Sequence, residues 1–139
     1  MAVPSSRNAR IFYRAARQRF EDAEFLMGVD RTTAAVYLAG YSVECILKAL
    51  ILANVPRAEE KEILAMFRGA RARDYVWLLR LYAERGGPDL PSELVLHFAR
   101  VNTWSTDMRY SPGTIALRDV KAFLDSALKI LAWGDGRLS

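Results

Sequence analysis

Apolar residues recur every three to four positions along nearly the whole chain, which is the period of an α-helix with one buried face. No stretch alternates apolar and polar positions as a strand does. The pattern predicts helices over residues 7–27, 33–54, 58–67, 71–85, 91–104 and 114–132. We therefore expect an all-α protein, a compact up-and-down bundle of four long helices plus one or two short ones.

Glycine and proline mark the ends of these helices. Gly28 is placed to stop the first helix, and Pro56 ends the second because the residue before a proline avoids the helical conformation. Asp30 or Thr32 is expected to cap the second helix and Thr114 the last one. With 139 residues, no repeat and no linker, residues 1–139 form one predicted domain, with frayed tails at 1–6 and 134–139.

The predicted helix over 33–54 carries only two charged residues, Glu44 and Lys48, and should be central to the core. Those two charges and the Ala, Gly and Tyr around them favour a buried helix over a membrane span. The first ten residues contain no apolar segment of the secretory type. A cytoplasmic location is therefore the expectation.

Composition limits the possible chemistry. A single Cys excludes an internal disulfide, and one Cys with one His cannot complete a four-ligand structural zinc site. We expect no metal and no cofactor. The net charge is +4, and residues 1–20 contain five arginines and no acid. Arginine suits phosphate because its planar guanidinium binds two oxygens at once. An anionic partner and a merely solvated helix face explain this pattern equally well.

Two groups of residues have the spacing of a site. Tyr37, Tyr41, Glu44 and Lys48 recur at intervals of four, three and four, so they share one helix face. Either Glu44 and Lys48 pair at the edge of the core, or the stripe lines a cleft in which Glu44 orients an arginine from another helix.

The second group lies before the last helix and contains Arg100, Trp104, Asp107, Arg109 and Tyr110. Two guanidinium groups beside aromatic rings can hold a phosphate and stack a base. In the other interpretation, Arg109 pairs with Asp107 or Glu44 and the rings fill the core. His97 is expected to be structural rather than catalytic.

Two segments together resemble a known family. The helix AAVYLAGYSVECILKALILA contains Val43-Glu44 followed by Leu47-Lys48-Ala49, and a second segment reads Met108-Arg109-Tyr110-Ser111-Pro112 before a final helix ending in LDSALKILAW. Both are similar to segments of the HEPN family, the higher eukaryote and prokaryote nucleotide-binding domains, of the small bacterial type. The resemblance covers about residues 10–134.

The resemblance implies a compact helical bundle, often a homodimer, with a polar cleft around the dimer axis. Many members cut RNA without a metal, using an Arg followed four to six residues later by a His. In that mechanism the 2′-OH of the RNA attacks the adjacent phosphate while the Arg stabilises charge and the His moves protons. Other members bind nucleotides or pair with a small nucleotidyltransferase in two-gene toxin–antitoxin systems.

This sequence departs from the nuclease pattern, because no His follows Arg100 or Arg109 within that range. We therefore expect a non-catalytic module that binds a nucleotide or RNA, with Arg109 as the candidate if catalysis occurs. The predicted binding residues are Arg100, Trp104, Arg109, Tyr110, Glu44, Lys48 and Tyr41. One alternative is a metal-independent endoribonuclease toxin using Arg109 with a proton shuttle other than His. The other is a protein partner of a small nucleotidyltransferase.

Overall fold

The computed structural model describes residues 6–108 and 115–138, which fold into helices without strands. The α-helices are α1 (Arg7–Gly28), α2 (Thr32–Asn54), α3 (Glu60–Met66), α4 (Tyr75–Glu84), α5 (Ser92–Met108) and α6 (Leu117–Arg137). Short 3₁₀ turns at Arg57–Glu59 and Ala70–Arg73 precede α3 and α4. The predicted all-α class is confirmed.

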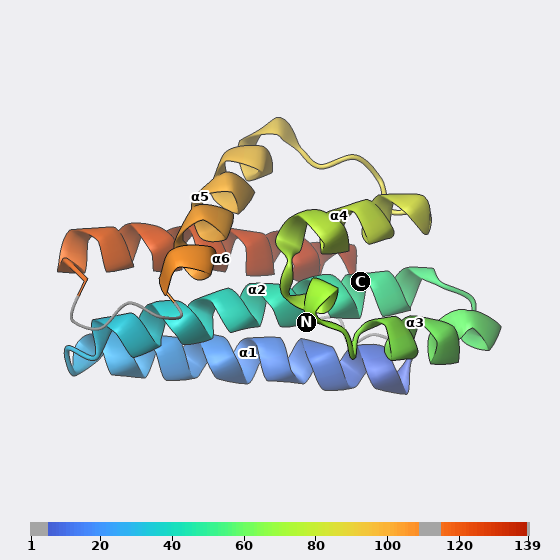
Figure 1. The fold of residues 1–139 in the computed structure, drawn as a ribbon, viewed down its shortest axis with the longest axis horizontal. Helices are drawn as coiled ribbons and strands as arrows, with labels where there is room; N and C mark the ends of the chain where they lie inside the picture. The colour runs from blue at the N-terminus through green and yellow to red at the C-terminus, as the bar shows by residue number, and fades with distance from the viewer. Residues whose placement is uncertain (1–5, 109–114, 139) are drawn as a thin grey trace.

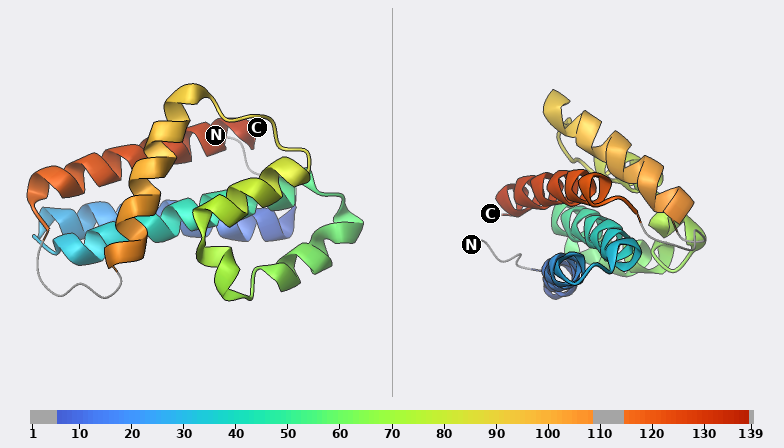
Figure 2. Two further views of the ribbon diagram at one scale, coloured as in Figure 1. Left: turned by 45° about the horizontal axis from the view of Figure 1, so that its top comes forward. Right: turned by 90° about the vertical axis from the view of Figure 1, so that its left-hand side faces the viewer.

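Three long helices share the long axis of the molecule. Helices α1 and α2 form an antiparallel hairpin, and α6 lies along α2 (Figure 1). Helix α5 crosses α6 and α2 obliquely, and α4 lies over the C-terminal half of α2 (Figures 1 and 2).

Helix α2 is the core element, as its low charge predicts. It is buried almost throughout and contacts α1, α4, α5 and α6. Within the described residues it is also the one helix long and apolar enough to cross a membrane, but 83% of its apolar window is buried in the bundle. Gly134 lets α6 approach it, because a Cβ there would lie 2.5 Å from Cγ1 of Ile46.

The predicted frayed tail from residue 134 is wrong. Helix α6 continues to Arg137, and Leu138 is 7% exposed and belongs to the core. Burial of Gly134 and Leu138 stabilises this end. Ser6 is also ordered and caps α1, with its hydroxyl accepting from the Ala9 N–H.

Several helix boundaries differ from those that the sequence pattern predicts. Helix α5 ends at Met108 rather than near 104, because polar residues such as Ser105, Thr106 and Asp107 lower helix propensity only slightly and do not by themselves stop a helix. Asp74 divides the predicted 71–85 helix by accepting from the Val76 N–H as the N-cap of α4. The N-cap of α2 is Arg31, and the Thr32 hydroxyl instead accepts from the Ile115 N–H. Thr114 lies outside the described residues.

Candidate functional site

The seam between α1 and α2 contains an ion pair inside the protein. Lys48 Nζ lies 2.7 Å from Glu44 Oε2, and the two side chains are 8% and 9% exposed. The ammonium also lies over two rings, 5.8 Å from the centroid of Phe12 and 5.4 Å from that of Phe67. This geometry is the i,i+4 pair that the sequence offered as one of two interpretations.

The Glu44–Lys48 pair has no net charge and is buried from solvent. Glu44 forms its ion pair with Lys48 on the same helix, and the edge-to-face contact between Phe12 and Phe67 covers the ammonium. A buried charge is tolerated when a partner of opposite sign satisfies it. Any role of Glu44 or Lys48 towards a ligand remains a prediction.

The other two residues of the stripe on α2 are exposed to solvent. Tyr37 and Tyr41 are 50% and 42% exposed, one turn apart on α2. Below them Cys45 is buried, and desolvation with the Glu44 charge raises the pKa of its thiol to about 12. The pKa of Tyr41 is raised chiefly by Cys45 and then by burial, and Arg19 of α1 opposes the shift.

The seam between α5 and α6 has a different polar cluster. Arg100 Nη1 donates to Ser126 Oγ at 3.0 Å, and His97 Nδ1 lies 2.9 Å from the same oxygen. Ser126 is fully buried, His97 is half-buried and Arg100 is exposed. One hydroxyl of α6 therefore fixes two side chains that lie on one face of α5 at i,i+3 spacing.

This cluster presents positive charge to solvent. A guanidinium has five N–H donors, so its contact with Ser126 leaves most of them available to a ligand. Among the residues whose side chains are described, Arg100 forms no ion pair. The arrangement suits recognition of a phosphate or carboxylate.

The sequence pointed to Arg100 and gave His97 a structural role, but it gave no role to Ser126. Ser126 stands among the buried apolar residues of α6, where a hydroxyl needs a polar partner. That signal was present in the sequence. Nothing in the chain's periodicity, however, says which helix supplies the partner.

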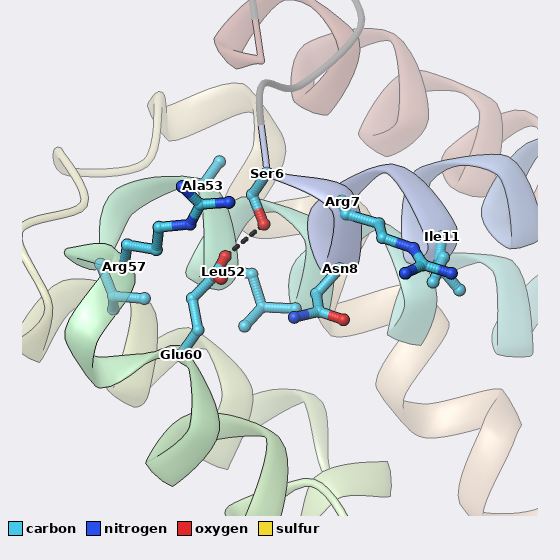
Figure 3. Close-up of a pocket in the computed structure, with 9 residues that line it drawn as sticks. Ser6, Arg7, Asn8, Ile11, Leu52, Ala53, Arg57 and Glu60 are labelled. Carbon is cyan, nitrogen blue, oxygen red and sulfur yellow. Dashed lines mark hydrogen bonds between the residues drawn. The ribbon is translucent and has the colours of Figure 1, made fainter.

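Two grooves border these elements. The groove between α5 and α6 has a volume of 510 Å³ and is lined by Glu93, Leu94, His97, Lys129, Ala132 and Trp133. A groove of 730 Å³ lies between the start of α1 and the end of α2, where the Ser6 hydroxyl donates to Glu60 (Figure 3). Arg7 and Arg57 also line this second groove, and both are exposed.

The remaining predicted residues lie outside the described part of the chain. Arg109 and Tyr110 belong to the segment 109–114, and the side chain of Trp104 is likewise not described. The possible pairing of Arg109 with Asp107 or Glu44 therefore stays a prediction. Within residues 6–108 and 115–138, no group of three His, Cys, Asp or Glu side chains is placed to hold a metal ion.

The fold and the α5–α6 seam together define an all-α helical domain with an interhelical groove beside an exposed arginine. The sequence pattern of the HEPN domain matches residues 9–137. The chain therefore belongs to the HEPN domain family.

A structural comparison agrees on the fold. The crystal structure of TT1696 from Thermus thermophilus is similar, with a TM-score of 0.67 and 24% identity over 95% of this chain and 99% of that one. No curated protein matches the sequence.

Proposed function

We propose that this HEPN domain binds a nucleotide or RNA, with Arg100 as the residue that anchors a phosphate. One observation carries the proposal: Ser126 fixes the Arg100 guanidinium, yet the side chain stays exposed. A preorganised arginine loses less rotational freedom when a phosphate binds. Membership of a nucleotide-binding family supports the same class of ligand.

Binding rather than cleavage is the first proposal because the Arg-x4–6-His spacing is absent from the sequence. A second candidate, metal-independent RNA cleavage, is favoured by the contact that places His97 beside Arg100 on one hydroxyl. The histidine would move protons and the arginine would stabilise charge on the phosphate.

Protein binding remains a further candidate, because Phe25, Val95 and Leu96 are 69%, 52% and 74% exposed. Exposed Phe98, Leu131 or Trp133 would favour an apolar docking face. Phe98 and Leu131 are 5% and 7% exposed, and Trp133 is half-buried between the rings of Tyr82 and Phe98.

The proposed function is tested by fluorescence polarisation with a labelled RNA oligonucleotide and a labelled nucleotide. Arg100→Ala should weaken binding about tenfold to a hundredfold, the range expected for a lost hydrogen bond to a charged group. Arg118→Ala is the matched control, because that side chain is 91% exposed on α6. Equal affinities of the two variants would contradict the assignment of Arg100.

Cleavage is tested separately by incubating RNA with the protein in EDTA and analysing the product ends. Cyclic phosphate ends that disappear in His97→Ala, while binding persists, would establish the second candidate. Intact RNA with binding retained would leave a binding module.

A further inference from the structure

The groove between α5 and α6 has one cationic end and one aromatic end. His97 lines the groove at one end, where the Ser126 hydroxyl joins it to Arg100 beside the groove, and Lys129, which also lines it, follows Ser126 by one helical turn on α6. Trp133 lies a further turn along, and Glu93 lies one turn before His97 on α5. Helix α5 meets α6 at the His97–Ser126 and Phe98–Trp133 contacts, and Glu93, Lys129 and Trp133 line the groove beside them.

From this order we infer that the groove binds a single nucleotide unit, with its phosphate at the cationic end and its base against Trp133. The inference rests on the proposed function and deepens it by naming the residues and the portion of the ligand each one meets. A volume of 510 Å³ is within the range of small-molecule sites.

The aromatic end suits a flat ring. Trp133 is held at right angles to Tyr82 and Phe98, with ring centroids 6.0 and 6.2 Å away, so its orientation is fixed by packing. Leu94 is buried and Ala132 is exposed and small, so the groove has an apolar floor and an open side. A base stacked on a tryptophan contributes in a sequence-tolerant way.

The polar groups of the groove are placed to meet the phosphate and the ribose of a nucleotide. Lys129 pairs with Asp125 at 3.1 Å, but both side chains are more than half exposed, so the pair is weak and the ammonium can turn to a phosphate. Glu93 is exposed and next to the aromatic end. A carboxylate there can accept hydrogen bonds from ribose hydroxyls.

The test uses the full chain with Trp77 and Trp104 in place, and the part of the tryptophan signal that Trp133→Phe removes is assigned to Trp133. AMP should quench its fluorescence in a saturable way, and Lys129→Ala should raise the Kd about tenfold or more. Lys121→Ala, an exposed lysine two turns earlier on α6, is the control and should leave the Kd unchanged. Adenosine, which lacks the phosphate, should bind equally to both variants.

Glu93→Gln tests independently whether Glu93 recognises the ribose hydroxyls. The parent should prefer AMP over 2′,3′-dideoxy-AMP, and the variant should lose most of that preference. A purely structural role of Glu93 would change both affinities alike.

A free nucleotide and the end of an RNA strand share this chemistry. Oligonucleotides with and without a 5′-phosphate separate them: quenching of Trp133 by the phosphorylated oligonucleotide, at lower concentration than AMP, assigns the groove to an RNA end. The opposite order assigns it to the free nucleotide.

Nucleotide or RNA binding and its location in the α5–α6 groove can be disproved separately. If polarisation detects binding but Trp133 does not respond, or Lys129→Ala and Lys121→Ala behave alike, the groove assignment is overturned and the proposed function stands. If neither nucleotide nor RNA binds by any measurement, both fail.

Discussion

The α1–α2 seam and the α5–α6 seam both contain charged groups at a helix interface, but they treat that charge in opposite ways. At the first, Glu44 and Lys48 neutralise each other beneath two aromatic rings. At the second, the buried Ser126 is neutral and leaves the charge of Arg100 facing solvent. A charge that is paired and covered serves the fold, whereas one that is anchored and open is available for recognition.

The most direct test of this contrast is to remove one partner of the buried pair. Lys48→Met should lower the free energy of unfolding by about 3–5 kcal/mol, because it leaves the Glu44 carboxylate buried without its ammonium. Glu44→Leu combined with Lys48→Met should recover most of that loss, since no buried charge remains. Urea denaturation followed by circular dichroism measures both.

Lys121→Met is the control for this pair, because Lys121 is an exposed residue of α6 and should change stability by no more than about 0.5 kcal/mol. If Lys48→Met costs no more than that control, the ion pair is screened by water and the α1–α2 seam is not closed.

The sequence predicted the bundle well because helical periodicity is a local property. The burial of α2 followed from its two charges in twenty-three residues, and the Glu44–Lys48 contact followed from i,i+4 spacing. The end of α5 and the split at Asp74 were missed, since helix ends and capping depend on backbone detail.

Only part of the candidate site could be predicted from the sequence. Ser126 is 26 residues from Arg100 and 29 from His97, and their contact depends on how α5 crosses α6. Apolar periodicity says which face of each helix is buried, but the crossing angle follows from side-chain packing between the helices.

A change of pH tests the burial of Cys45, beside Glu44 on α2, without removing any contact. Burial raises the pKa of Cys45 from 9.0 to about 12, so the folded protein keeps the thiol proton when an unfolded chain has already lost it. The unfolded form then binds fewer protons, and stability falls as pH rises above about 9, by at most about 1.4 kcal/mol per pH unit.

Urea denaturation at several pH values between 8.5 and 10.5 measures this slope. Cys45→Ala should flatten it. Some slope should remain in Cys45→Ala because of Tyr13. Burial, and then the neighbouring Asp135, raise the pKa of Tyr13, so its ionisation also lowers stability as pH rises. Identical slopes for the parent and Cys45→Ala would show that Cys45 is solvated in the folded state.

The smallest effect on stability is expected at the open seam. Ser126→Ala removes the hydroxyl shared by His97 and Arg100, but these side chains reach solvent and can exchange it for water. The variant should therefore lose only about 1 kcal/mol of unfolding free energy, the net value of an ordinary hydrogen bond. Binding of RNA or a nucleotide should still weaken, by less than in Arg100→Ala, because the arginine remains present but is no longer fixed. A loss of stability as large as that of Lys48→Met would mean that the α5–α6 seam is as closed as the α1–α2 seam, and that Arg100 is held for the fold rather than for a ligand.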